Sequence, residues 1–292
     1  MQTRLIAALV VFIATTAFAA TQPPFYEPSL SPDAKTIAFV SGGDIWTVPI
    51  TGGDARLLVA NPATESRPLF SPDGKSLAFV STRTGNGDIY ILDLTTGDTR
   101  RLTYDDTREL LDGWKRDGKW IYYSSNSGEA DSGAADIWRI PSAGGTAMPV
   151  TNERMMYEYF AAPSPDGKSV AFVASGFANA QWWRKGHSHM DESQIFTVDA
   201  DHHYAAITAD GAKELWPMWS PSGDRIFYVS DRSGSDNIWS IVPGSQPQKL
   251  TNFTSGRVIW PAISNDGRGI VFERDFGIWS FDTANGKVGQ VP

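Results

Sequence analysis

Short apolar runs of about six residues, separated by polar turns, follow one another along this chain. The run Ser76-Leu77-Ala78-Phe79-Val80-Ser81 is apolar on both faces, which indicates a strand packed between two neighbouring sheets. The run from Asp88 to Leu94 predicts a further strand. After the turn at Thr96-Gly97-Asp98, a short run that ends at Leu102-Thr103 predicts another. With the strand expected before Ser71, these runs form a unit of four strands.

The unit occurs six times in the chain. Its first half is a turn that resembles Ser71-Pro72-Asp73-Gly74-Lys75, and copies of this turn occupy residues 31–35, 71–75, 115–119, 164–168, 220–224 and 264–268. Its second half resembles Asp88-Ile89-Tyr90, and its copies occupy residues 44–46, 88–90, 136–138, 194–196, 237–239 and 277–279. Proline fixes φ near −65° and Asp-Gly favours a tight turn, so the first half is expected to connect the first two strands. We interpret it as a feature of the fold and not as a binding site.

A repeat of roughly 40 to 50 residues with four strands per copy is typical of a β-propeller. The chain is therefore predicted to be an all-β, six-bladed propeller of four-stranded blades over residues 21–292. The approximate blade boundaries are 25–65, 66–106, 107–154, 155–211, 212–254 and 255–292. Trp46, Trp138, Trp239 and Trp279 share one position in the third strand and are expected to pack in the core. Lys287 to Pro292 predicts a fourth strand for the last blade, whereas the alternative is an N-terminal strand from residues 21 to 30.

The first 20 residues have a different pattern. Arg4 precedes an apolar run from Leu5 to Ala14, and Ala17-Phe18-Ala19 places small residues where a signal peptidase reads them. Residues 1–20 are predicted to be a signal peptide that is cut after Ala19 or Ala20. The apolar run is short for a transmembrane helix. The mature protein is expected in the periplasm or outside the cell, with no membrane span.

Composition narrows the range of partners and chemistry. The chain contains no cysteine, which excludes disulfides and a cysteine-based zinc site. Its formal net charge of −8 argues against a nucleic-acid partner, since such binding depends on clustered Lys and Arg residues. Known catalytic signatures are absent, including Gly-x-Ser-x-Gly, His-Glu-x-x-His and the phosphate and dinucleotide loops. No catalytic residue and no cofactor are predicted.

The fourth copy of the repeat is longer than the others. Its extra residues lie between Gly176 and Glu192, and long loops on rigid scaffolds often carry binding residues. The candidate binding residues are Trp182, Trp183, Arg184, Lys185, His187 and His189. The tryptophans and the basic pair would contact a peptide by stacking and charge, and the alternative is that the two tryptophans cover an edge of the blade. His187, His189 and Asp191 also have a spacing that suits a transition metal, against the simpler interpretation of a polar surface loop, and no metal site is predicted. His202-His203 is interpreted as part of a surface turn.

The Ser-Pro-Asp-Gly-Lys and Asp-Ile-Trp repeats resemble the WD40-like (PD40) repeats shared by the TolB periplasmic protein and the N-terminal regions of several peptidases. Leu215-Trp216-Pro217-Met218-Trp219, with Asn237-Ile238-Trp239 after it, is similar to the fifth blade of the N-terminal propeller in tricorn-type serine peptidases. Trp182 to Gly186 falls where that family carries a basic, aromatic insertion. The resemblance extends from about Phe25 to Pro292 and implies a propeller that guides peptides toward catalytic domains.

Three functions are consistent with this sequence. The first is a non-catalytic propeller that binds or channels peptides or proteins, at the N-terminal end of an exported tricorn-like serine peptidase whose catalytic domains act in cis or in trans. The second is a free-standing, TolB-like periplasmic scaffold with a protein or peptide ligand. The third is a propeller hydrolase or lyase with a metal held by His187 and His189.

Overall fold

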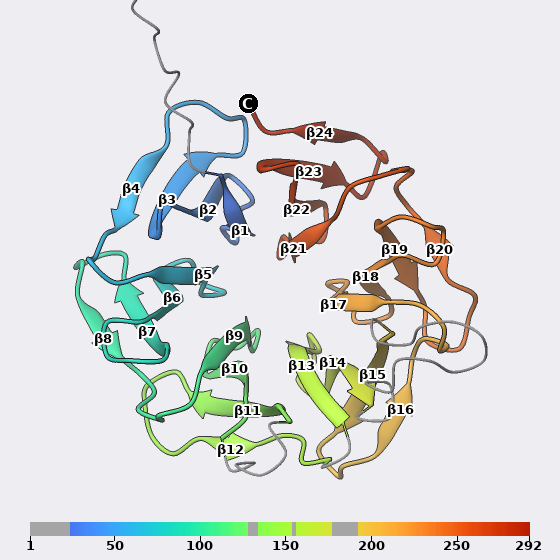
Figure 1. The fold of residues 1–292 in the computed structure, drawn as a ribbon, viewed down its shortest axis with the longest axis horizontal. Coiled ribbons are helices and arrows are strands. Elements are labelled where there is room, and N and C mark those ends of the chain that lie inside the picture. Colours follow the sequence, from blue (N-terminus) through green and yellow to red (C-terminus); the bar gives the residue numbers. More distant parts are fainter. Residues whose placement is uncertain (1–23, 128–133, 154–155, 177–191) are drawn as a thin grey trace, which may run out of the picture.

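The computed structural model describes residues 24–127, 134–153, 156–176 and 192–292. Six four-stranded antiparallel sheets surround a central axis (Figure 1). The strands of the first three blades are β1 (Tyr26–Leu30), β2 (Thr36–Ser41), β3 (Asp44–Pro49), β4 (Arg56–Val59), β5 (Glu65–Phe70), β6 (Ser76–Ser81), β7 (Asp88–Asp93), β8 (Thr99–Arg101), β9 (Glu109–Trp114), β10 (Trp120–Ser125), β11 (Asp136–Pro141) and β12 (Met148–Pro149). Those of the last three blades are β13 (Met156–Pro163), β14 (Ser169–Gly176), β15 (Gln194–Asp199), β16 (Tyr204–Ala206), β17 (Glu214–Trp219), β18 (Ile226–Ser230), β19 (Asn237–Ile241), β20 (Gln248–Lys249), β21 (Ile259–Ile263), β22 (Gly269–Arg274), β23 (Gly277–Asp282) and β24 (Val288–Gln290).

Each sheet consists of four consecutive strands, and the first strand of each lies nearest the axis (Figure 1). The predicted six-bladed, all-β propeller is thus confirmed for the described residues. The two repeat motifs lie where the sequence predicts them. The six turns at residues 31–35, 71–75, 115–119, 164–168, 220–224 and 264–268, here named the Ser-Pro turns after their commonest form, join the first two strands of each blade, and the Asp-Ile-Trp element begins the third strand. Within the described residues, no helix is long and apolar enough to span a membrane.

The hydrophobic core lies between neighbouring blades. Phe79 and Leu77 of β6 are completely buried, and they pack with Ala38 and Ile45 of the first blade. A strand that is apolar on both faces is therefore covered by one blade on each side, as its sequence predicts. The third-strand tryptophans, such as Trp46 and the residues equivalent to it, pack against these inter-blade clusters.

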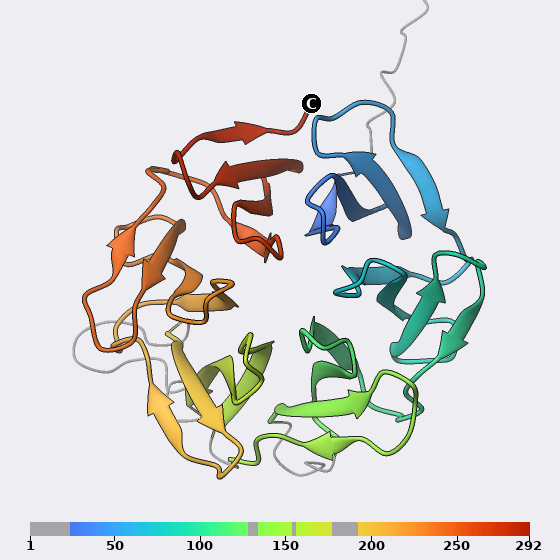
Figure 2. The same cartoon turned by 180° about the vertical axis from the view of Figure 1, so that it is seen from behind.

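The ring closes without an exchanged strand. The last sheet is β21 to β24, so the prediction that the C-terminal segment supplies its fourth strand is confirmed, and β1 pairs with β2 in the first blade. Side chains close the seam, because Ile37 and Phe39 share a buried cluster with Val271 and Ile278. The C-terminus lies beside the first blade (Figure 2), where the Gly53 N–H donates to the Pro292 carbonyl at 3.3 Å.

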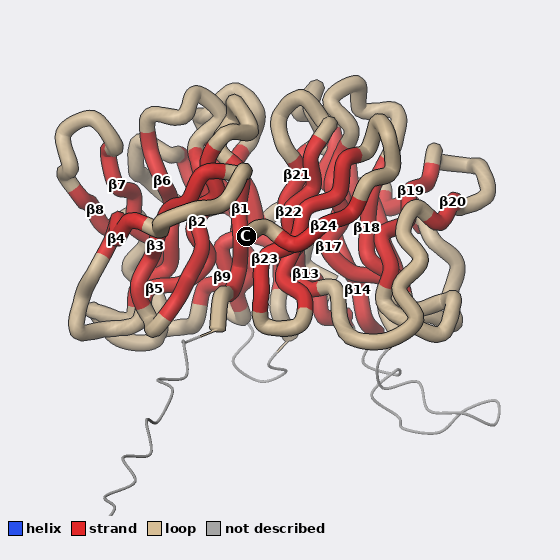
Figure 3. The backbone as a smooth tube through the Cα atoms, turned by 90° about the horizontal axis from the view of Figure 1, so that it is seen from above, coloured by secondary structure: helices blue, strands red, loops and turns tan. Residues whose placement is uncertain are grey.

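The Ser-Pro turns stand together on one face of the ring, here named the motif face. Figure 3 shows the ring edge-on, with its connections gathered on two opposite faces. In four of the six turns the Ser hydroxyl donates to the Asp carboxylate two residues later, as from Ser71 to Asp73 at 2.7 Å, and accepts the N–H at the start of the second strand. This hydrogen bond holds the pKa of Asp73 below its ordinary value. The motif therefore fixes the geometry of each hairpin.

Candidate binding site

A β-bulge interrupts the pairing of each inner strand with its neighbour. In five of the six inner strands a residue other than glycine has a positive φ at this point, and these residues are Glu27 (51°), Arg67 (54°), Phe160 (58°), Trp216 (53°) and Trp260 (52°). In the third blade Asp112 occupies the bulge. Such backbone conformations cost of the order of 1 to 3 kcal/mol each and persist where the surroundings enforce them. We name these six residues the axial cluster.

Arg67 is the centre of the axial cluster. Its guanidinium carbon lies 4.0 Å from the centroid of the Trp260 ring and 5.9 Å from that of Phe160. Nε and Nη2 donate to the carbonyl of Leu111, at 2.9 and 2.6 Å respectively, and Nη2 is 3.8 Å from the carboxylate of Asp112. The side chain is only 11% exposed. One cation from the second blade is thereby held by the third, fourth and sixth blades.

Aromatic rings complete the axial cluster. Phe160 stacks on Trp216 with centroids 5.2 Å apart and meets the edge of Trp260 at 5.4 Å. The centroids of Trp216 and Trp260 are also 5.4 Å apart. Since these rings come from the fourth, fifth and sixth blades and Arg67 comes from the second, the side chains meet across the axis.

Two carboxyl groups belong to the same cluster. Glu27 accepts the backbone N–H of Arg67. The side chain of Asp112 is fully buried, and it accepts a hydrogen bond from the Ser124 hydroxyl. Burial raises the pKa of Asp112 to about 7, although the Arg67 guanidinium favours its ionised form. Replacing Arg67 would therefore leave the buried carboxyl of Asp112 without a nearby positive charge.

A cavity of about 260 Å³ extends from the axial cluster toward the motif face. The same stretch of every repeat lines it, from the bulge to the Ser-Pro turn, as in Glu27 to Leu30 with Pro32 and in Arg67 to Pro72. The wall includes Trp114 and Trp219, whose indole N–H groups donate to main-chain carbonyls of the neighbouring inner strand. The prolines of the Ser-Pro turns also line the mouth of this cavity.

At the mouth of the cavity, two residues differ from the proline that the repeat has there. Arg116 and Asn265 occupy the position that is proline in the other four turns. Arg116 donates to the carbonyls of Pro221 at 2.9 Å and of Asn265 at 3.4 Å. The Asn265 side chain donates to the carbonyl of Pro72 at 3.4 Å. Both residues are exposed, so these hydrogen bonds across the mouth can be exchanged for hydrogen bonds to a ligand.

The binding residues predicted from the sequence, Trp182, Trp183, Arg184, Lys185, His187 and His189, lie outside the described residues, as does Asp191. His202 and His203 do lie in the exposed turn between β15 and β16, as predicted. There Asp199, Asp201 and His203 bring their possible ligand atoms within 4.8 Å of one another. Asp199 also accepts the N–H groups of Asp201 and His203, so hydrogen bonds within the turn account for this arrangement.

The axial cluster is not among the binding residues predicted from the sequence. No single residue type is common to its members, and five of them are found only by counting four residues back from the first residue of a Ser-Pro turn. The stretch that includes Trp216 and Pro217 was noted for its resemblance to a family and not for its position. A search for residues of varied type at one fixed offset from a repeat would have found the cluster.

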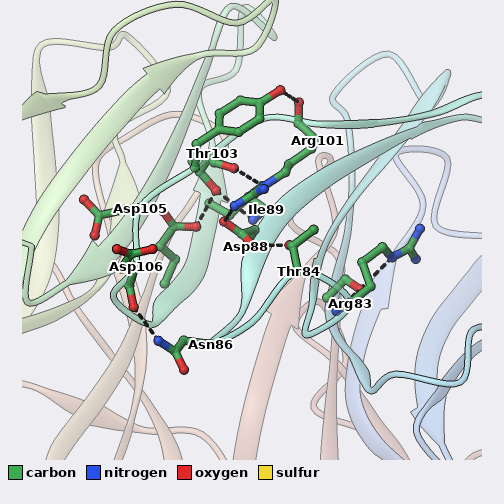
Figure 4. Close-up of polar contacts among 12 residues, drawn as sticks. Arg83, Thr84, Asn86, Asp88, Ile89, Arg101, Thr103, Asp105 and Asp106 are labelled. Carbon is green, nitrogen blue, oxygen red and sulfur yellow. Dashed lines mark hydrogen bonds and ion pairs between the residues drawn. The ribbon is translucent and has the colours of Figure 1, made fainter.

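Buried carboxyl groups also stand where one blade meets the next. Glu109 accepts a hydrogen bond from Thr103, whose hydroxyl accepts the Ile89 N–H at 2.8 Å (Figure 4). In the same group of residues, the Arg101 guanidinium is 2.7 Å from the carboxylate of Asp88. Burial, assisted by the negative charge of Asp88, raises the pKa of Glu109 to about 8. Burial likewise raises the pKa of Glu158 to about 7.

We expect the stability of the protein to fall as the pH rises from about 5 to 8. In the folded protein Asp112 and Glu158 stay largely protonated up to about pH 7 and Glu109 up to about pH 8, whereas ordinary carboxyl groups of an unfolded chain, with pKa values of about 4, are ionised over this interval. Unfolding thus releases protons, and each group contributes up to about 1.4 kcal/mol of lost stability per pH unit. The aspartates of the Ser-Pro turns have lowered pKa values and act only below this interval.

Melting temperatures at pH 5.5 and pH 8 measure this effect. The value at pH 8 should be lower by several degrees, and Glu109→Gln should reduce the difference because it removes the group with the highest of these pKa values. A melting temperature that stays constant or rises over this interval would show that these carboxyl groups are ionised in the folded protein.

Six four-stranded blades around an axial cavity define this molecule as a six-bladed β-propeller. Residues 25–287 match the family described as the tricorn protease N-terminal beta propeller domain. The match covers most of the chain, which therefore belongs to this family.

Similar proteins include both peptidases and TolB. The tricorn protease homolog 1 of Streptomyces coelicolor is 26% identical over 271 residues, which cover 91% of this chain and 24% of that protein. The Tol-Pal system protein TolB of Francisella tularensis is 31% identical over 186 residues, which cover 61% of this chain and 39% of that protein. Among solved structures, the crystal structure of the tricorn protease aligns with a TM-score of 0.75 and 20% identity over 93% of this chain and 26% of the other. The chain spans less than half the length of the curated relatives that it matches.

Proposed function

We propose that this propeller is a non-catalytic module that binds peptides or proteins in its axial cavity. The observation that carries the proposal is the cavity itself, which is walled by aromatic and proline residues and has a few polar groups at its floor and mouth. Concave apolar sites with a few placed polar groups are the usual form of ligand sites. Because side chains of the axial cluster meet across the axis, binding from the motif face is better supported than passage through the ring.

Capture of peptides from a casein digest by the immobilised protein tests this function. The wild type should retain peptides that mass spectrometry identifies, and Asn265→Trp should reduce the retained amount about tenfold because an indole at the exposed mouth narrows it. Leu57→Trp is the matched control, since Leu57 is 50% exposed on the outer strand β4, and it should retain peptides as the wild type does. Equal retention by both variants, or no retention by the wild type, would contradict the proposal.

We propose further that the module is the N-terminal part of an exported tricorn-like serine peptidase, with catalytic domains in cis or in trans. The family relationship and the predicted signal peptide support this assignment, and they also support the proposal that the protein works in the periplasm or outside the cell. The second candidate is a free-standing scaffold like TolB, which the similarity to that protein favours. An immunoblot of the source cells separates them. A product much larger than 31.9 kDa supports the peptidase, and one near 30 kDa supports the scaffold.

We also propose that the long segment between Gly176 and Glu192 in the fourth repeat contacts the peptide. Trp182 and Trp183, with the basic pair Arg184-Lys185 after them, would contribute stacking and charge. Replacing both tryptophans with alanine should weaken capture of the same peptides. Unchanged capture would remove this loop from the proposed site.

A further inference from the structure

We propose that the ligand of the axial cavity is an acidic, extended peptide segment whose carboxylate pairs with Arg116. This inference rests on the proposed function and specifies the chemistry of its ligand. Three observations carry it, namely a second cavity that joins the first, two arginines with no carboxylate partner among the described residues, and the engagement of the acidic side chains beside them in hydrogen bonds or ion pairs.

The axial cavity continues outward between the second and third blades. A neighbouring cavity of about 340 Å³ shares Ser71, Pro72, Trp114 and Arg116 with it and extends to Arg100. Arg116 therefore stands at the junction of the two. A ligand that fills both must be long and narrow, which suits an extended peptide more than a compact small molecule.

Two exposed cations, Arg116 and Arg100, lie along this path. The guanidinium groups of Arg116 and Arg100 donate to main-chain carbonyls, and neither forms an ion pair with a carboxylate of the described residues. Charge-assisted bonds to a carboxylate are stronger than such bonds to carbonyls. Both side chains are exposed, so exchanging one partner for the other requires no rearrangement of the core.

The acidic groups on the same path are already engaged. Asp73 accepts the Ser71 hydroxyl and the Lys75 N–H, at 2.7 and 3.1 Å, and Asp117 lies 3.3 Å from the ammonium of Lys115. At the floor, Glu27 and Asp112 are engaged with Arg67. The overall charge of −8 would repel an acidic ligand at long range, so any preference for one must come from direct contact with Arg116 and Arg100.

Fluorescence anisotropy with three fluorescein-labelled heptapeptides tests this inference. All have a Leu-Phe-Leu core, and the flanking residues are Asp in the first, Ser in the second and Lys in the third. We expect the Asp peptide to bind about tenfold more tightly than the Ser peptide, and the Lys peptide to bind most weakly. Raising the salt concentration from 0.05 to 0.5 M should weaken the binding of the Asp peptide more than that of the Ser peptide.

Variants at the mouth separate charge from shape. Arg116→Ala should reduce the affinity for the Asp peptide about tenfold, to that of the Ser peptide. Arg116→Lys should give an intermediate affinity, because lysine keeps the positive charge but lacks the planar guanidinium group that can donate two hydrogen bonds to a carboxylate. Arg100→Ala should have a smaller effect in the same direction. Arg56→Ala, at an exposed position on the outer strand β4, is the control and should change nothing.

The outcomes are distinguishable. If the three peptides bind equally well, or if Arg116→Ala leaves their order unchanged, the inference is overturned while peptide binding stands. If none of the three binds although casein peptides are captured, the inference again fails and the proposed function does not. If neither probe binds, both fail.

Discussion

Replacing Arg67 with alanine is expected to lower the free energy of unfolding by about 3 to 5 kcal/mol. The change removes the cation above the Trp260 ring and both donors to the Leu111 carbonyl. It also leaves the fully buried carboxyl of Asp112 without the nearby positive charge. Breaking one side of a buried, hydrogen-bonded charge pair is among the costliest single substitutions, because the remaining partner has lost its solvent as well as its counter-ion. Urea denaturation at pH 8, where Asp112 with its pKa of about 7 is ionised, measures the loss.

Two further variants identify the cause. Arg67→Met with Asp112→Asn should recover more than half of the loss, since the double variant removes both charges together. Arg56→Ala should cost less than about 0.5 kcal/mol, because that side chain is exposed. A loss below about 1 kcal/mol for Arg67→Ala would mean that the axial cluster is not a structural centre of the ring.

The second large effect is expected at Gly267, in the Ser-Pro turn of the last blade. A Cβ atom there would lie 2.5 Å from Cδ and 2.7 Å from Cγ of Pro221, which belongs to the turn of the fifth blade. Its φ of +73° is also unfavourable for alanine. Gly267→Ala should therefore cost about 2 to 4 kcal/mol, as the sum of backbone strain and overpacking against a rigid ring. Thermal denaturation and urea denaturation both measure this change.

Gly223→Ala is the matched control for Gly267→Ala. It stands at the same point of the preceding turn with a φ of +75°, but the nearest atom to its Cβ would be 3.5 Å away, on Pro165. It should cost only about 1 kcal/mol, which isolates the contribution of the backbone. Equal losses for the two variants would show that contact with Pro221 contributes nothing, and the inter-blade role of the Ser-Pro turns would then be wrong.

The first blade offers the converse substitution. Ala34 occupies the glycine position of its turn with a φ of +56°. Ala34→Gly should therefore stabilise the protein by up to about 1 kcal/mol, less the greater chain entropy that glycine adds to the unfolded state. A loss of stability would show that this entropy outweighs the relieved strain.

The architecture was predictable because equivalent positions of the blades carry similar residue types for the same physical reasons. Ser71 and Asp73 form the hydrogen bonds of the turn, and Phe79 is buried between blades, so these positions recur with the same chemistry. The place of the last strand also followed from counting strands. In these respects local turn chemistry and burial agree with the global fold, which is why pattern alone sufficed.

The axial site was not predictable in the same way. Its residues meet only when six inner strands converge, and the blades contribute five different types of side chain, with tryptophan in both the fifth and the sixth blade. Conformations with positive φ at Phe160 and Trp216 contradict local preference, and such contradictions are expected where tertiary structure or function dictates the backbone. Departures from the repeat were visible at Arg116 and Asn265, but without the ring nothing in the sequence places them at one mouth.

The most direct test of the account is hydrogen exchange of the purified protein with and without the tightest-binding casein peptide at saturation. Binding in the axial cavity predicts slower amide exchange along residues 67–72, 112–116 and 216–221, which line it. Exchange in the connections of the opposite face, such as residues 102–108, should stay unchanged. Protection confined to that opposite face, with the inner strands unaffected, would contradict the assignment of the axial cavity as the ligand site.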